Sequence, residues 1–238
     1  IKKESNIRSC MGSDITFEQF NNSLVNSSIS SFYLTTQMRC IGGIIYTDYI
    51  DNIFNCSQES KLEVENYDFK LFNDVDKMIN SIKQLDKKYG LCRNAAGYSW
   101  EWISKKIKGY NNVIKQGKED IKIKNYKYVW NMTNKEFILS ENAINEIGCI
   151  HTLQGYDLNY VGVILGEEID YDPSANRIII DLNKFYDKYV KQDCSNEEVE
   201  RYIINAYKVI LSRGIKGCYV YACNKNMQEY LSKYIDEV

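Results

Sequence analysis

The feature that most constrains the fold is a set of short apolar runs separated by segments with helical periodicity. The clearest runs are Val161–Leu165, Ile178–Ile180 and Cys218–Ala222. Runs that are apolar at consecutive positions are typical of strands buried on both faces of a parallel sheet. Helical patterns lie between them, so the sequence predicts an α/β domain around a mostly parallel central sheet. We expect residues 1–238 to form this single domain.

Apolar spacing and capping residues predict the other elements. The clearest helix begins after Asp74, which can cap it, and ends at Gly90, where a C-terminal glycine belongs. Other helices are expected over residues 14–25, 44–54, 99–107, 197–212 and 227–235. Other strands are expected over residues 31–34, 69–72, 92–96 and 148–151. Residues 126–130 are expected to form an edge strand or an ordered loop.

Charge and cysteine content narrow the class of protein. The chain has 30 basic and 32 acidic residues, so a nucleic-acid partner would need a local basic patch. No apolar run approaches the roughly 20 residues that span a membrane, so no membrane partner is expected. The eight cysteines lack the tight spacing of a zinc knuckle. They indicate reduced, buried thiols in a cytoplasmic protein with no metal site, and zinc or a disulfide framework is the alternative.

Three polar segments adjoin the predicted strands, and we place them at carboxyl ends, where open α/β sheets collect working residues. They cover residues 35–40, 151–157 and 212–214. Arg39 and Arg213 stand in two of them. The forked guanidinium group suits the charge that builds on a transferred phosphate. Taken singly, an arginine at a strand end is more often part of a surface ion pair than of a site.

The order of these segments resembles the motifs of superfamily-one helicases. Residues 34–39 (LTTQMR) resemble motif IV, residues 148–157 (GCIHTLQGYD) motif V, and residues 206–220 (AYKVILSRGIKGCYV) motif VI. Together with the phrases at 96–102 (AGYSWEW) and 129–131 (VWN), they resemble the Schlafen-type, group three DNA/RNA helicase-like domains, a bacterial family of unknown function. The resemblance spans roughly residues 34–222.

The resemblance implies a RecA-like three-layer fold and identifies the chain with the second motor domain of such a helicase. It implies that Arg39 and Arg213 are catalytic and reach the γ-phosphate of ATP. It also implies that Gln37 and Asp157 contact the nucleotide, Asp157 at the ribose. Met38 stands where relatives carry an aromatic residue that stacks on adenine, which departs from the family pattern.

The motif V segment implies the remaining contacts. His151 and Thr152 would touch the nucleic-acid strand, and Gln154 with Gly155 would bind the nucleotide and link it to the strand. Cys149 replaces the usual motif V threonine, which removes one phosphate contact. The expected partner is a single-stranded nucleic acid, with DNA favoured over RNA.

A P-loop is missing from the sequence. The pattern G-x-x-x-x-G-K-[ST] cradles phosphates, and the nearest candidate, Gly117-Lys118-Glu119, lacks the first glycine and the hydroxyl residue. We therefore expect ATP and Mg²⁺ to be held mainly by an N-terminal P-loop domain absent from this chain. The fragment alone is then expected to be inactive.

Two other interpretations remain open. The chain could be a non-catalytic α/β module that binds nucleic acid or protein. Cys149 and His151 could also form a hydrolase pair, although the sequence shows no third orienting residue and no oxyanion-hole pattern.

Overall fold

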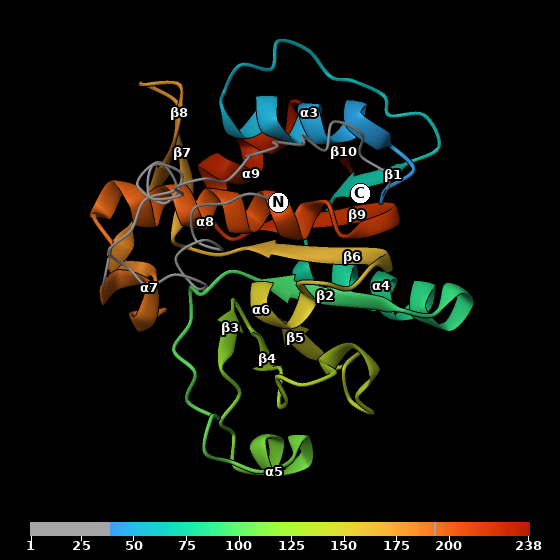
Figure 1. The fold of residues 1–238 in the computed structure, drawn as a ribbon, viewed down its shortest axis with the longest axis vertical. Helices are drawn as coiled ribbons and strands as arrows, with labels where there is room; N and C mark the ends of the chain where they lie inside the picture. The colour runs from blue at the N-terminus through green and yellow to red at the C-terminus, as the bar shows by residue number, and fades with distance from the viewer. Residues whose placement is uncertain (1–38, 193) are drawn as a thin grey trace, which may run out of the picture. The chain divides into compact units, whose positions relative to one another are not determined.

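A computed structural model describes residues 39–192 and 194–238 around an eight-stranded sheet (Figure 1). The strand order is β10-β1-β9-β6-β2-β5-β4-β3, and all neighbours are parallel except β3 and β4. The strands are β1 (Asp68–Leu71), β2 (Cys92–Ala96), β3 (Ile121–Ile123), β4 (Tyr126–Trp130), β5 (Glu146–Gly148), β6 (Leu158–Leu165), β9 (Gly214–Ala222) and β10 (Asp236–Glu237). A separate antiparallel pair consists of β7 (Ile169–Asp172) and β8 (Arg177–Ile180).

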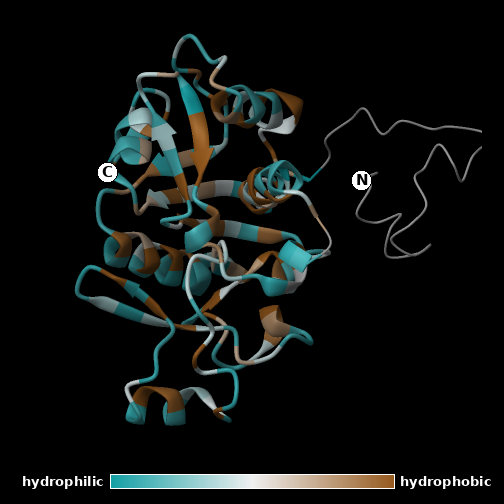
Figure 2. Cartoon of the chain, turned by 90° about the vertical axis from the view of Figure 1, so that its left-hand side faces the viewer, coloured by the Kyte–Doolittle hydropathy of each residue, from teal (hydrophilic) through white to brown (hydrophobic). Residues whose placement is uncertain are grey.

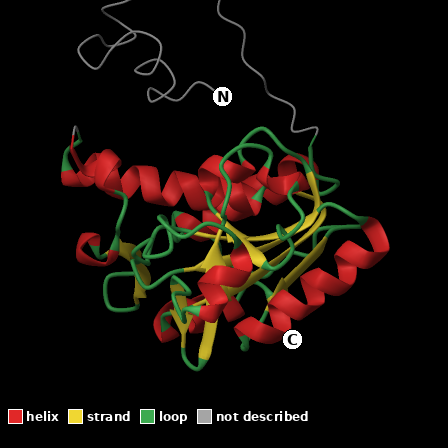
Figure 3. Cartoon of the chain, turned by 90° about the horizontal axis from the view of Figure 1, so that it is seen from below, coloured by secondary structure: helices red, strands yellow, loops and turns green. Residues whose placement is uncertain are grey.

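Helices cover both faces of the sheet, which gives the RecA-like three-layer arrangement that the sequence predicted (Figure 3). Figure 1 shows α8 on the near side of β6 and α4 on the far side. The α-helices are α3 (Gly43–Phe54), α4 (Val75–Tyr89), α5 (Tyr110–Lys115), α6 (Ile150–Leu153), α7 (Lys188–Gln192), α8 (Asn196–Leu211) and α9 (Lys225–Ser232). Two short 3₁₀ helices are η1 (Phe137–Leu139) and η2 (Leu182–Lys184).

The apolar runs form the central strands because both faces of those strands are buried. In β6, Val161 and Val163 pack in the cluster that contains α3, α8 and α9. Tyr160 and Ile164, which alternate with them, pack in the cluster that contains α4. A strand with two buried faces needs apolar residues at every position, which explains the unbroken run. Figure 2 shows the hydrophobic residues gathered along the sheet and the inner helix faces.

The cap and the C-terminal glycine predicted for the helix after Asp74 are present, and a second cap begins α8. The Asp74 carboxylate accepts a hydrogen bond of 2.9 Å from the Lys77 amide, and Gly90 ends α4 with φ +67°. Ser195 begins α8 in a capping box with Glu198, in which each side chain bonds the other residue's amide. These local signals fix the ends of the two longest helices. The predictions for residues 14–25 and 31–34 lie outside the described residues.

The prediction of a helix over residues 99–107 was wrong, because side chains hold this segment as a loop. The Trp100 and Trp102 rings pack against Trp130, with centroids 6.4 and 6.0 Å from it. The Asp120 carboxylate accepts hydrogen bonds from both the amide and the hydroxyl of Ser104. These long-range contacts outweigh the apolar spacing that indicated a helix.

Two strand predictions were also corrected. Residues 178–180 belong to the antiparallel β7–β8 pair and not to the main sheet. Only alternate residues of β8 pack inward, and Ile179 is 37% exposed. The strand expected over residues 148–151 ends at Gly148, because Thr152 bonds the amide of Cys149 and starts α6 instead.

None of the helices in the described part of the chain is long and apolar enough to cross a membrane. The seven cysteines among these residues carry free thiols, and four of them are buried, in agreement with the expected use of cysteine as a small apolar residue.

Gly162 tests how tightly α4 packs on β6. A Cβ at this position would lie 2.3 Å from Asn94 Oδ1 and 2.9 Å from Ile82 Cγ1. We expect Gly162→Ala to lower the free energy of unfolding by about 1–3 kcal/mol, since overpacking forces neighbouring groups apart. Denaturant unfolding measures this effect. Ser81→Ala, on the partly exposed side of α4, is the control and should change stability by less than about 0.5 kcal/mol. Equal stability of both variants would contradict the close packing.

Candidate functional site

Three residues far apart in the sequence meet at one edge of the sheet. Arg39 Nε donates a hydrogen bond of 2.5 Å to Asp157 Oδ1. Asp157 immediately precedes β6 and Arg213 precedes β9, and these strands pair with Leu158 opposite Gly214. The backbone amide of Leu158 bonds the carbonyl of Arg213 at 3.1 Å. Strand pairing therefore brings the two loops together, as the motif order implied.

Arg213 is buried without a full set of hydrogen-bond partners. The residue is 2% exposed, and its Nη1 reaches only the carbonyl of Tyr156, at 3.5 Å. Its Nε has no partner within the part of the chain that the structure describes. Burial lowers the pKa of Arg213, the charge of Arg39 lowers this pKa further, and Asp157 raises it in part. Arg213 therefore lies in the field of a second guanidinium, that of Arg39, as well as in that of the Asp157 carboxylate.

This cluster lies at the opposite edge from the one we expected. We expected all three polar segments at carboxyl ends of strands, but Asp157 and Arg213 precede β6 and β9. Each residue closes the loop that leads from a helix into a strand, so it lies at the amino end of that strand. His151 does follow a strand, β5, and the strand expected before Arg39 lies outside the described residues.

The α6 segment connects the middle of the sheet to this amino edge. Ile147 of β5 is level with Asn94, which is level with Gly162 of β6. Gly162 lies four residues beyond the start of β6, about 13 Å at 3.3 Å per residue. The segment from Cys149 to Asp157 therefore runs back by about this distance along the strand direction. His151, at its start, is separated by that distance from the arginine cluster at its end.

The residues of the α6 segment differ in exposure. The His151 side chain is 64% exposed, and its Nε2 lies 3.9 Å from Asp187 Oδ2. Thr152 is buried, and its hydroxyl is engaged with the backbone of Cys149. Gln154 is exposed, and Gly155 has φ +93°, a backbone conformation that glycine adopts readily. Gln37 lies outside the described residues.

A second polar cluster, which the sequence analysis missed, lies at the carboxyl edge around Glu168. Its Oε1 accepts a hydrogen bond of 2.6 Å from the hydroxyl of Tyr207, and its amide donates to Ser99 Oγ at 3.1 Å. Glu168 is fully buried, and its Oε2 has no partner among the described residues. A Cβ on Gly97 would lie 2.1 Å from the Tyr207 hydroxyl, so only glycine fits there. Tyr207 and Gly97 both belong to phrases that carried the resemblance.

Cys149 and His151 do not form a catalytic pair in the described part of the chain. Cys149 is buried, and its Sγ accepts a hydrogen bond of 3.1 Å from the hydroxyl of Tyr98. His151 lies instead against Asp187, and no hydrogen bond joins the imidazole to the thiol. No group of three or more potential metal ligands occurs among the described residues either.

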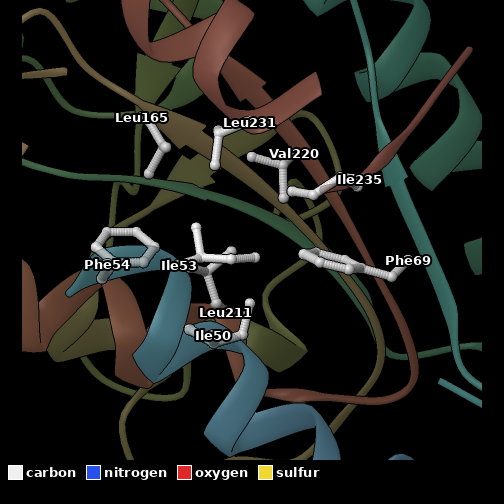
Figure 4. Close-up of a pocket in the computed structure, with 9 residues that line it drawn as sticks. All are labelled: Ile50, Ile53, Phe54, Phe69, Leu165, Leu211, Val220, Leu231 and Ile235. Carbon is white, nitrogen blue, oxygen red and sulfur yellow. The ribbon is translucent and has the colours of Figure 1, made fainter. Parts of the chain in front are cut away.

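An apolar pocket lies between α3, α8, α9 and the sheet (Figure 4). It is lined by Ile50, Ile53, Phe54, Phe69, Leu165, Leu211, Val220, Leu231 and Ile235. No lining side chain has a polar atom that could orient a nucleotide. We therefore regard it as a packing defect of the core.

Glu168 should make stability depend on pH. Burial raises the pKa of Glu168 above its ordinary value of 4.5, and hydrogen bonds from Tyr207 and Ser99 lower it in part. A carboxyl with a raised pKa holds its proton more tightly in the folded state. Its contribution to stability is therefore present at low pH and is lost as the pH rises above about 4.5.

We expect Glu168→Gln to remove this part of the decline in melting temperature between pH 5 and pH 8. The amide stays neutral and keeps an acceptor for Tyr207. Thermal unfolding across this pH range measures the effect, and Glu167→Gln, at the exposed neighbouring position, is the control. Parallel pH profiles for wild type and Glu168→Gln would show that the carboxyl titrates normally.

Comparison with known proteins agrees with the family resemblance. The model of the family "Schlafen group 3, DNA/RNA helicase domain" matches residues 6–224. The uncharacterized protein YPL245W of Saccharomyces cerevisiae is 30% identical over 240 residues. This match covers 91% of the chain and 51% of the yeast protein, so the chain spans about half the length of that relative. No solved structure matches. The relative is a yeast protein, so it lends no support to the expectation of a bacterial family.

Proposed function

Because the chain belongs to the Schlafen group 3 DNA/RNA helicase domain family, we propose that it is the second RecA-like motor domain of a superfamily-one helicase or translocase. The family match supports a helicase-like function that involves nucleic acid. The proposal adds that ATP drives the activity, that a P-loop domain holds the nucleotide, and that this chain supplies arginine fingers.

The observation that carries the proposal is the cluster of Arg39, Asp157 and Arg213. Burying a charged group without full hydrogen bonding is unfavourable, and a second positive charge beside it adds to this cost. A bound phosphate would offset both costs, because its oxygens accept forked, charge-assisted hydrogen bonds. Charge that develops on the γ-phosphate would strengthen these bonds, which is how arginine fingers accelerate hydrolysis.

In this proposal each of the two domains contributes part of the binding site for ATP and Mg²⁺. Arg39 and Arg213 suit a phosphate, and Asp157, once Arg39 turns toward that phosphate, would be free to accept from the ribose. Gly155 is exposed, with open space beside it, so the backbone there can approach a nucleotide. Gln154 and Gln37 are proposed as further nucleotide contacts. Mg²⁺ is proposed to bind the nucleotide phosphates together with the P-loop domain.

Strand contact is assigned to the start of α6. His151 is exposed and can reach a phosphate of a single strand, with DNA proposed ahead of RNA. Thr152 is buried, so its role would be indirect: its hydroxyl fixes the turn that presents His151.

Hydrolysis in the full-length gene product that contains this sequence tests the arginine fingers. Arg39→Ala and Arg213→Ala should each lower kcat for ATP hydrolysis by a factor on the order of 10³. Arg177→Ala, at an exposed position of β8, is the control and should leave kcat unchanged. The 238-residue chain alone should show no steady-state hydrolysis. Unchanged turnover in both site variants would leave the cluster as a structural ion pair and favour a binding module.

Arg213→Met separates catalysis from folding in the same assay. Methionine keeps much of the buried stem and removes the charge, so the melting temperature should be equal or higher. A large fall in melting temperature would show that the guanidinium serves stability.

Strand contact is tested by titrating labelled single-stranded DNA against the full-length protein. His151→Ala should weaken binding by about the same factor as His151→Ala combined with Thr152→Ala. Thr152→Ser, which keeps the capping hydroxyl, should bind like wild type. The loss should be similar for different DNA sequences, since phosphate contacts position the strand and do not read it. Wild-type affinity for the double variant would place the strand elsewhere.

A further inference from the structure

The β3–β4 hairpin carries two lysines on its outer face and a third in its turn, where Lys124 Nζ lies 5.8 Å from the centre of the Tyr221 ring. Lys122 of β3 lies directly opposite Lys127 of β4, and Lys124 stands in the two-residue turn between the strands. All three side chains are exposed, and none forms an ion pair with a described residue. We call Lys122, Lys124 and Lys127 the lysine face.

The opposite face of the hairpin is anchored to the core. Ile121 and Ile123 are buried in the cluster that contains α4. The hydroxyls of Tyr126 and Tyr128 donate to Asp74 and Asp76 at 3.4 and 3.3 Å. The Trp100 indole also donates to the carbonyl of Lys122, at 3.2 Å. The lysine face is therefore presented on a packed element and not on a loose loop.

Few acidic residues lie near the lysine face in the sequence, and Asp74 and Asp76 contact the hairpin tyrosines on the opposite face. Residues 105–127 contain eight lysines and two acids, Glu119 and Asp120, whereas the whole chain has a net charge of −2. Asp120 is buried and accepts hydrogen bonds from the amide of Trp130 and from Ser104. Glu119 is partly buried, with Oε2 turned away from solvent. The segment is thus the local basic patch that a chain without an overall positive charge needs to attract an anionic partner.

The positions of these lysines lower the stability of the fold, so stability does not explain them. Like charges directly opposite each other in a sheet are destabilising. Lys124 has φ +52°, a conformation that glycine or asparagine adopts more readily. Lysines also protect edge strands from aggregation, and β3 is an edge strand. That role does not require Lys127, because β4 is paired on both sides.

We propose that the lysine face binds the phosphate backbone of a single-stranded nucleic acid, as a contact separate from His151. The class of partner rests on the proposed function, and the surface itself rests on charge and geometry. Lysine acts as a point charge, so the contact contributes affinity without sequence preference. It would extend the strand path beyond the motif segments, over the outer face of the hairpin.

The test uses the 238-residue chain and a fluorescein-labelled, 20-nucleotide single-stranded DNA of mixed sequence. Fluorescence anisotropy gives the affinity at several salt concentrations. For Lys122→Gln/Lys124→Gln/Lys127→Gln, we expect affinity to fall at least about tenfold at low salt. The slope of log affinity against log salt should fall by about 2, at about 0.7 for each phosphate that a lysine no longer neutralises. The control Lys87→Gln/Lys88→Gln/Lys225→Gln removes the same charge at exposed positions elsewhere and should bind within about twofold of wild type.

Several outcomes would overturn the proposal. Unchanged DNA affinity in the lysine-face variant would contradict it directly. An equal loss of DNA affinity in the control variant would indicate attraction by net charge alone. Aggregation of the variant, with unchanged affinity of its monomer, would assign the lysines to edge protection. Loss of binding to vesicles of anionic lipid, with DNA binding intact, would assign them to a membrane surface. Equal melting temperatures of variant and wild type show that a binding loss is not unfolding.

The two proposals fail separately. If the lysine face does not bind DNA but Arg39→Ala and Arg213→Ala abolish hydrolysis, the motor function stands without this contact. If the arginine variants hydrolyse ATP normally and the lysine-face variant loses DNA, the chain binds nucleic acid without serving as the second half of a motor.

Discussion

The pairing of β6 with β9 is the interaction on which the rest of the structure depends. These two strands share the longest register in the sheet, from Leu158 opposite Gly214 to Leu165 opposite Ala222. Both are buried on both faces, so each carries the helix layers above and below it. Their amino ends set Asp157 beside Arg213, and the carboxyl end of β6 leads to Glu168. A shift of one residue in this register would turn every core side chain to the wrong face and separate the arginine cluster.

The sequence predicted those parts of the fold whose cause is local. The unbroken apolar runs of β6 and β9, the Asp74 cap and Gly90 are each visible within a few residues. The predictions that were wrong concern segments whose structure depends on contacts that a local pattern does not show. The loop at Trp100 depends on Trp130 and Asp120, and β8 leaves the main sheet because only alternate residues face the core. Cys149 begins α6 through a hydrogen bond to Thr152 that no periodicity reveals.

The candidate site was predictable only in part, for a related reason. Arg39, Asp157 and Arg213 were identified from motif order, and strand pairing then brings them together, although at the amino edge. Their roles remain predictions. Glu168 escaped notice because an acidic residue after a strand usually faces solvent. The available signal was a glycine after each of two strands, Gly97 after β2 and Gly166 after β6, which mark backbone held close to another group.

The position of β9 in the sheet has a consequence for how the chain is made. In the sheet β9 lies between β1 and β6, yet along the described chain it follows β8. The 142 residues between Leu71 and Gly214 must be synthesised before β1 meets this partner. At about 5–20 residues per second, that delay is roughly 7–30 s. β1 stays open on the ribosome for this whole time, and one edge of β6 stays open for the 48 residues between Leu165 and Gly214, roughly 2–10 s. These open edges expose the nascent protein to wrong pairing and give chaperones a defined interval in which to act.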